Sequence, residues 1–187
     1  MNFPALFNDT WEQSRQNILP LLINTLILLA VSLISFGILA PVAMAGYCSS
    51  IHRMVKDGRE PQAADLFCEM RLFIPLAVFG LATLLTVLFG IMFFVLPGII
   101  VIFALSFTCL YMIPLMVDKR LGIVDAVKES FAMARRGPVM DHILTILIII
   151  GAQIVGGSFL LGTLVTTPLT TVFLMNVYEY KLDHDFL

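Results

Sequence analysis

Formal charge is confined to four short patches of this 187-residue sequence, and the long stretches between them carry none. All eleven Lys and Arg and all thirteen Asp and Glu lie in four patches: Asp9–Arg15, Arg53–Arg71, Asp118–Asp141 and Glu179–Asp185. Stretches of 36, 46 and 36 residues separate the patches: Gln16–Ile51, Leu72–Val117 and Ile143–Tyr178. A helix needs about 20 apolar residues to cross a bilayer core, so each stretch approaches the length of two spans. The sequence therefore predicts an all-α integral membrane protein.

Each uncharged stretch contains helix breakers near its middle: Gly37 with Pro41, Leu96-Pro97-Gly98, and Gly156-Gly157 with Gly162. Proline is best accommodated in the first turn of a new helix, so these motifs predict chain reversals. We expect six transmembrane helices in three hairpins: Asn17–Phe36, Pro41–Val55, Leu72–Val95, Gly98–Val117, Ile143–Gly157 and Gly162–Tyr178. The chain is then one membrane domain over residues 1–187. Its parts are an interfacial helix (1–16), hairpins at 17–57, 72–117 and 143–179, a cytoplasmic loop (58–71), a cytoplasmic amphipathic helix (118–142) and a tail (180–187).

The composition agrees with a membrane protein and argues against some classes of function. Hydrophobic residues make up 59% and charged residues 13%, against about 25% charged in soluble domains. The net charge of −2 argues against a nucleic-acid partner. The three cysteines, Cys48, Cys68 and Cys109, have neither disulfide nor metal-site spacing, so we expect no cofactor.

The distribution of Lys and Arg predicts the orientation. An even number of spans places both termini and both charged loops on one face, and short loops rich in Lys and Arg remain in the cytoplasm. We therefore expect a protein of the bacterial cytoplasmic membrane with both termini inside. Only eleven residues separate Pro41 from His52, so the second helix crosses only if Arg53 and Lys56 extend to the interface. One long tilted helix over Gln16–Ile51 would instead give five spans and an external N-terminus.

Two segments outside the spans have amphipathic helical patterns. Phe3, Leu6, Phe7 and Trp11 recur at helical spacing, which predicts a short helix in the membrane interface. The segment Ile123–Arg136 is also amphipathic and ends with two arginines. The cations that could hold lipid headgroups or a protein partner are Lys128, Arg135, Arg136, Arg53 and Lys56.

Polar side chains within the predicted spans are few. Five threonines share one face of the last span at helical spacing: Thr163, Thr166, Thr167, Thr170 and Thr171. The face predicts either close helix packing or a hydroxyl-lined path. Asn24 and Gln153 are the largest polar side chains within the membrane, and we expect each to pair with the other or with the threonines.

No predicted span contains Asp, Glu, Lys or Arg, which removes the usual markers of proton relays and ion paths. The three histidines have no metal-binding spacing, and catalytic motifs are missing, so we expect neither a metal site nor an enzyme. A lipid-modifying enzyme would depend on the interfacial residues Asp118, Asp141, His52 and His142.

Four short motifs resemble bacterial multispanning proteins of unassigned function. They are LPGII at 96–100, VDKRLGIVDAVKES at 117–130, RRGP at 135–138 and, more loosely, PVAMAGY at 41–47. The similar proteins include the family of domains of unknown function numbered 975 and the membrane domain of proteins like glycerophosphodiester phosphodiesterases. The resemblance covers roughly Leu72–Tyr178. It implies a six-helix inner-membrane bundle without catalytic residues.

The function expected from these observations is a non-catalytic scaffold or accessory subunit, with partners at the cytoplasmic loops. Its partners would be membrane lipids, a protein, and a second copy through small-residue faces such as Ala152–Gly156. The alternative is a pore or facilitator for a neutral or lipid-like solute, built from the threonine face and the gap between hairpins.

Overall fold

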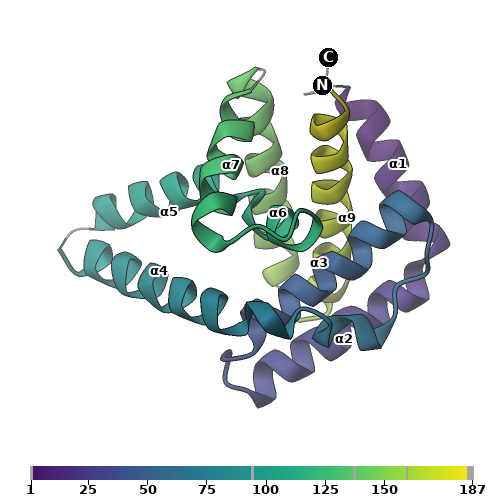
Figure 1. Cartoon of the computed structure of the whole chain (residues 1–187), viewed down its shortest axis with the longest axis horizontal. Coiled ribbons are helices and arrows are strands. Elements are labelled where there is room, and N and C mark those ends of the chain that lie inside the picture. The colour runs from purple at the N-terminus through teal and green to yellow at the C-terminus, as the bar shows by residue number, and fades with distance from the viewer. Residues whose placement is uncertain (1, 94, 137, 159, 185–187) are drawn as a thin grey trace.

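The computed structural model describes residues 2–93, 95–136, 138–158 and 160–184, and among these residues there are helices but no β-strand (Figure 1). The prediction of an all-α fold is confirmed. The α-helices are α1 (Phe3–Gln16), α2 (Ile18–Ile34), α3 (Ala40–Asp57), α4 (Phe73–Phe93), α5 (Val95–Cys109), α6 (Met112–Asp118), α7 (Ile123–Arg135), α8 (Val139–Gly157) and α9 (Leu160–His184). Two short 3-10 helices, η1 (Ala63–Phe67) and η2 (Met70–Leu72), lie in the loop after α3.

Three pairs of long consecutive helices pack against each other: α2 with α3, α4 with α5, and α8 with α9. The short helix α6 packs against α7. Between α2 and α3 the chain passes through Phe36 and Gly37, with positive φ angles of 50° and 82°, and Pro41 lies in the first turn of α3. The sequence predicted that the helix would begin at Gly98, after the reversal at Leu96-Pro97-Gly98. In the structure α5 begins at Val95, so this motif lies in the first turns of the helix. Breaker residues thus mark the helix pairs well.

The helix predicted over Gly98–Val117 is present as the span-length segment Gly98–Asp118, with a short break between α5 and α6. In an unbroken helix the Tyr111 amide would donate to the Phe107 carbonyl. Here Tyr111 N donates to Ser130 Oγ at 3.1 Å, and the Phe107 carbonyl lies 3.0 Å from His142 Nε2. A carbonyl only accepts, so His142 donates from Nε2. Side chains of α7 and α8 therefore replace the missing helical bond.

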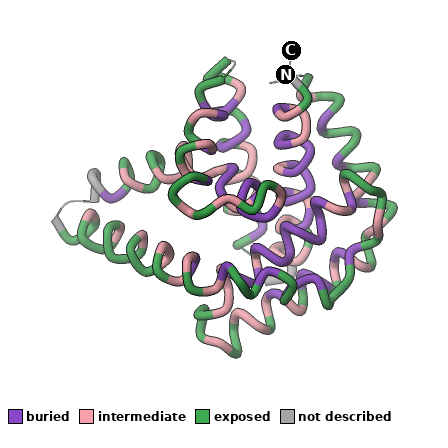
Figure 2. Tube along the Cα trace, viewed as in Figure 1, coloured by how far each residue is buried: buried purple, intermediate pink, exposed green. Residues whose placement is uncertain are grey.

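Helix α3 is the centre of the fold. Figure 2 shows buried residues concentrated along α3 and α9, whereas α4 is mostly exposed. Tyr47 and Ile51 of α3 pack with Leu66 and Met175 in one hydrophobic cluster. A second cluster joins α6, α7 and α9 around Leu115, Met133 and Tyr178.

Helix α1 packs against α9, the last helix of the chain. Asn176 Nδ2 donates to Thr10 Oγ1 at 3.1 Å and to Gln13 Oε1 at 3.0 Å, and the rings of Phe7 and Phe173 stack at 5.1 Å. After Gln16 the chain bends by 85° into α2. The helix predicted at the N-terminus is present; its buried residues are Leu6, Thr10 and Ser14, and Trp11 is exposed.

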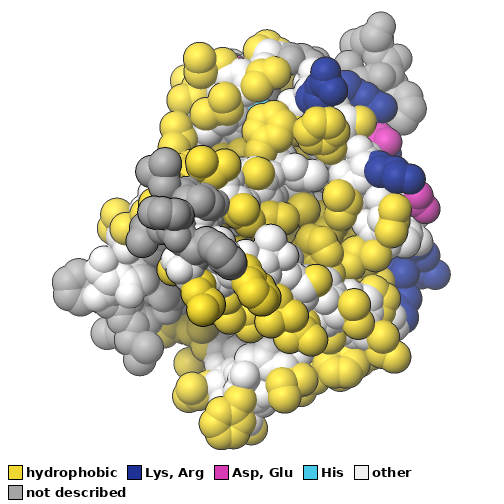
Figure 3. Space-filling view, turned by 90° about the vertical axis from the view of Figure 1, so that its left-hand side faces the viewer, with side chains coloured by type: hydrophobic (Ala, Val, Ile, Leu, Met, Phe, Trp, Pro, Cys, Tyr) yellow, Lys and Arg dark blue, Asp and Glu magenta, His cyan; other side chains and the backbone are white. Residues whose placement is uncertain are grey.

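Three helical segments are long and apolar enough to cross a membrane, or four if the bent α1–α2 pair counts as one span. The three are Ala63–Met92, Gly98–Asp118 and Val139–Gly157. Six spans were predicted from sequence, and α3 and α9 are not among the segments that are long and apolar enough. The face seen in Figure 3 is nevertheless covered by hydrophobic side chains, with charged groups along one edge.

Gly46 allows the loop after α3 to lie directly on that helix. A Cβ atom at this position would collide with the carbonyl group of Leu66 in η1 and would lie 2.6 Å from the Asp65 carbonyl oxygen. Both obstacles are backbone atoms, which cannot rotate away. The small residue therefore sets the distance between α3 and η1.

We predict that Gly46→Ala destabilises the protein by about 1 to 3 kcal/mol, as overpacking does in other cores. The matched control is Gly151→Ala in α8, where an added Cβ has no neighbour within 4 Å. The stability of Gly151→Ala should equal or exceed that of the wild type, because alanine is more favourable than glycine within a helix by up to about 1 kcal/mol. Thermal unfolding in detergent micelles measures both. Equal melting of Gly46→Ala and wild type would contradict the close contact.

Candidate functional site

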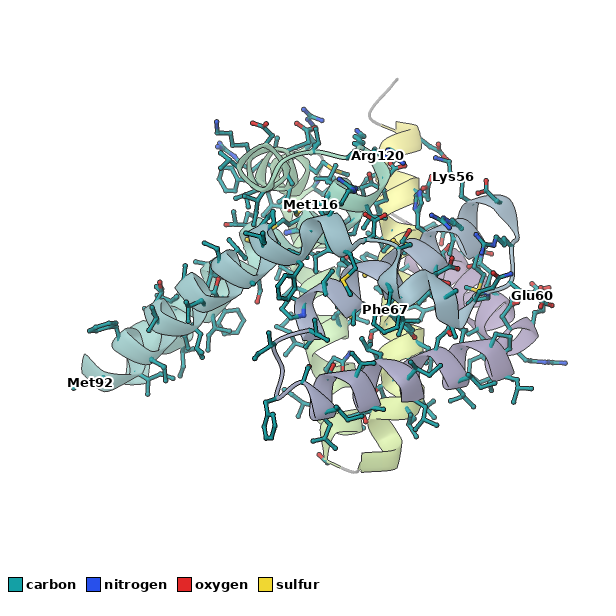
Figure 4. The ribbon with its side chains drawn as sticks, turned by 60° about the horizontal axis from the view of Figure 1, so that its bottom comes forward. Lys56, Glu60, Phe67, Met92, Met116 and Arg120 are labelled. Atoms are coloured by element: carbon teal, nitrogen blue, oxygen red, sulfur yellow. The ribbon has the colours of Figure 1, made fainter. Side chains whose placement is uncertain are left out.

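Five side chains from α3, α6 and α9 form the densest group of ionisable residues, here called the His52 centre: His52, Lys56, Asp118, Tyr178 and Glu179. His52 Nε2 lies 3.2 Å from Asp118 Oδ1, and His52 Nδ1 lies 3.3 Å from Glu179 Oε1. Tyr178 donates its hydroxyl proton to Asp118 Oδ2 at 2.8 Å. Lys56 Nζ lies 3.8 Å from Asp118 Oδ1. Figure 4 shows Lys56 and Arg120 on the side of the molecule opposite Met92.

Three side chains of the His52 centre are largely shielded from solvent, and the centre contains both acidic and basic side chains. The side chains of His52, Asp118 and Glu179 are only 10%, 18% and 22% exposed. Within the described residues, His52 Nδ1 and Glu179 Oε1 form no hydrogen bond of acceptable geometry, so their contact is electrostatic. The centre joins α3, α6 and α9 through close contacts between ionisable side chains.

A second ionic group fixes the loop after α3. Asp65 is buried, and its carboxylate accepts hydrogen bonds from Ser50 Oγ at 3.1 Å, Arg53 at 3.3 Å and Arg59 at 3.2 Å. Arg53 and Lys56 were predicted from sequence to face lipid or a partner. In the structure Arg53 pairs with Asp65, and Lys56 belongs to the His52 centre.

The other predicted contact residues lie on α7. Arg136 pairs with Glu129 at 3.0 Å, and the Arg135 guanidinium lies over the Phe131 ring at 5.5 Å. Lys128 is exposed on the same helix. Val124 and Phe131 add exposed apolar surface beside these cations. Helix α7 thus presents a mixed basic and apolar face.

The predicted threonine face lies largely between α8 and α9. Thr166, Thr170 and Thr171 each donate to a carbonyl four residues earlier in their own helix, at 2.8 to 3.0 Å. Gln153 of α8 donates to Thr170 Oγ1 at 2.9 Å, so this part of the polar pairing was anticipated. A Cβ at Gly156 would collide with Thr166. These contacts are those of tightly packed helices.

The remaining predicted polar residues take separate positions. Thr163 and Thr167 are half-buried on α9. Asn24 is buried on α2, and its Nδ2 atom has no hydrogen-bond partner among the described residues.

The gap between hairpins is an apolar groove of about 370 Å³, and the threonine face does not line it. It lies between α4, α5 and α8, where Phe79, Leu105 and Ile146 contribute to its walls. Thr83, Ser106 and Cys109 are its polar or weakly polar members. The groove and the threonines are therefore two separate features.

The four interfacial residues considered for acid–base chemistry fall into two groups. His52 and Asp118 meet in the His52 centre, whereas His142 is fully buried at the break between α5 and α6. Asp141 lies in the first turn of α8. Within the described residues, no group of three or more His, Cys, Asp or Glu is placed to hold a metal ion.

Two members of the His52 centre were not identified from sequence. Tyr178 ends the last uncharged stretch and Glu179 begins the patch after it, and both are more than a hundred residues from His52. The sequence signal that could have identified them is their position near Lys181 at the end of a predicted span, since the other charged patches also begin at the ends of spans. Searches against protein families, curated proteins and solved structures found no match to this chain.

We predict that Asp118→Asn destabilises the fold by about 1 to 3 kcal/mol, because the amide leaves His52 and Lys56 without their shared anion. Asp125→Asn on the exposed side of α7 removes the same charge and should change stability by less than about 0.5 kcal/mol. Thermal melting of the detergent-solubilised protein distinguishes the two. If both variants melt alike, the His52 centre contributes nothing specific to stability.

Proposed function

We propose that this chain is a multi-pass protein of the bacterial cytoplasmic membrane that acts as a non-catalytic scaffold or accessory subunit. The observation that carries the proposal is the separation of charge from the hairpin turns. Helices α2, α4 and α5 contain no charged residue, and the charges of α3, α8 and α9 lie at the ends remote from their hairpin turns. This distribution suits helices that enter a bilayer from one side.

The hairpin turns expose large apolar side chains. Phe36 beside the first turn is 94% exposed, Met92 near the second is 83% exposed, and Val155 near the third is 70% exposed. Contiguous apolar patches are rarely left in water, whereas lipid covers them without cost. All three turns therefore favour a position within or across the membrane.

The charged ends support the proposed orientation. The segments 53–71 and 118–141 carry nine of the eleven Lys and Arg residues, and short cationic segments favour the cytoplasm. Six helices would then be embedded as three hairpins, with α3 shielded from lipid by its neighbours. Both termini would be cytoplasmic. The proposal agrees with the resemblance to bacterial multispanning proteins.

The arrangement of ionic groups supports a scaffold. The side chains of the His52 centre contact one another, and so do those of the group around Asp65. Polar groups that are satisfied internally in this way are typical of structural polar layers. By contrast, α7 directs Lys128 and Val124 outward. We infer that partners bind at the basic and apolar face of α7.

Thiol labelling tests the topology. Cys68 is exposed in the loop after α3, so an impermeant maleimide should reach it only in inverted vesicles. In a Cys68→Ser background, Phe36→Cys should react only from the external side. The Cys68→Ser protein without the added cysteine measures background labelling by Cys48 and Cys109. Labelling of position 36 from the cytoplasmic side would contradict the proposal.

Site-specific photo-crosslinking tests the scaffold function. A photoreactive residue replacing Val124 should form a discrete protein adduct in native membranes. The same residue replacing Ile74, an exposed position of α4, should form lipid adducts only. Lys128→Gln with Arg135→Gln and Arg136→Gln should abolish the protein adduct, because a basic partner face loses its charge. Lipid adducts alone at both positions would contradict a protein partner at α7.

A further inference from the structure

Three hollows meet at Trp11, the only tryptophan of the chain. One of about 170 Å³ lies between α1, α2 and α9, and another of about 220 Å³ lies between α1, α8 and α9. The third, of about 390 Å³, runs along the outer face of α1. Trp11 itself is 63% exposed. The three hollows therefore surround one side chain, that of Trp11.

The two inner hollows are apolar. Leu169 lines both of them and so separates them, with Ile18 and Val165 on one side and Ile148 and Phe173 on the other. Two narrow apolar branches on either side of one side chain suit a molecule with two hydrocarbon chains.

One polar atom near the first branch is unsatisfied. Ser14 lines that hollow and is 6% exposed, and its hydroxyl has no hydrogen-bond partner among the described residues. A buried hydroxyl without a partner is unfavourable, so a bound hydrogen-bond acceptor would stabilise it. Ester and phosphate oxygens are such acceptors.

The outer hollow carries one charge of each sign. Arg15 and Glu12 both line it, together with Asn8 and Gln16. Among the described residues Arg15 makes no ion pair, and Glu12 accepts only a hydrogen bond from Gln16 Nε2, at 3.3 Å. A hollow that carries one cation and one anion complements a zwitterionic ligand better than it complements an anionic ligand. Arginine matches phosphate geometry, and a carboxylate pairs with a primary ammonium group.

We propose that the α1–α2 bend binds a zwitterionic phospholipid with a primary amine, of the phosphatidylethanolamine class. Its phosphate pairs with Arg15 and its ammonium group with Glu12. The two acyl chains enter the apolar branches on either side of Leu169, and Trp11 lies at headgroup depth, where tryptophan is favoured. This inference rests on the proposed membrane location and names one lipid that the scaffold holds.

Because Trp11 is the only tryptophan, its fluorescence reports on this site directly. The full chain is reconstituted in vesicles that contain equal mole fractions of phosphatidylethanolamine and phosphatidylglycerol, with bromine on the acyl chains of one or the other. Brominated phosphatidylethanolamine should quench Trp11 more strongly, with a two- to fivefold preference, about that of one exposed ion pair. Glu12→Gln should remove the preference. Arg15→Gln should weaken quenching by both lipids, and the matched control Arg120→Gln, an exposed cation of another loop, should behave as wild type.

Equal quenching by both brominated lipids in the wild type would overturn the site and leave the membrane location intact, since Trp11 would then contact bulk lipid. An unchanged preference in Glu12→Gln would also overturn it. If no brominated lipid quenches Trp11, the α1–α2 bend does not meet the bilayer. In that case the thiol labelling at Phe36→Cys decides separately whether the hairpins are embedded.

Discussion

The burial of the polar end of α3 is the constraint on which the rest of this structure depends. His52 lies between Asp118 and Glu179, and Ser50 and Arg53 bind Asp65. Removing one partner from such a group leaves another charge without compensation, which costs far more than the group contributes when complete. Helix α6, helix α9 and the loop after α3 must therefore stay in place around α3, and the hairpins extend from that polar layer.

Local chemistry in the sequence predicted the helix pairs but not what holds them together. Gly37, Pro41 and Gly157 act through backbone geometry, so their effect is visible in a few consecutive residues. The break between α5 and α6 depends on Ser130 and His142, which come from two other helices. No local pattern announces that Ser130 will take the Tyr111 amide. The same holds for Gly46, whose importance arises from the approach of Leu66.

The number of spans illustrates a related limit of sequence reading. Charge-free length predicted six crossings, yet α3 is enclosed by protein over most of its length. A helix that is surrounded by protein side chains tolerates polar residues that a lipid-facing helix does not. Hydrophobic length measures what lipid would accept, and it does not reveal whether lipid or protein surrounds a helix. The charged C-terminal turn of α3 is consistent with its central position.

The α4–α5 hairpin shows why function should be sought in the polar layer and at the α1–α2 bend. Half of the residues whose burial is described in α4 and α5 are exposed, with Leu81, Leu88 and Phe103 among the large ones. Water would make this surface unfavourable, but lipid tails are as apolar as leucine and neither attract nor repel it. Under the proposed membrane location, the hairpin anchors the protein in lipid and provides little chemical selectivity. Selectivity requires charges at defined positions, and the described residues provide such charges in the His52 centre, on the α7 face and in the hollow lined by Arg15 and Glu12.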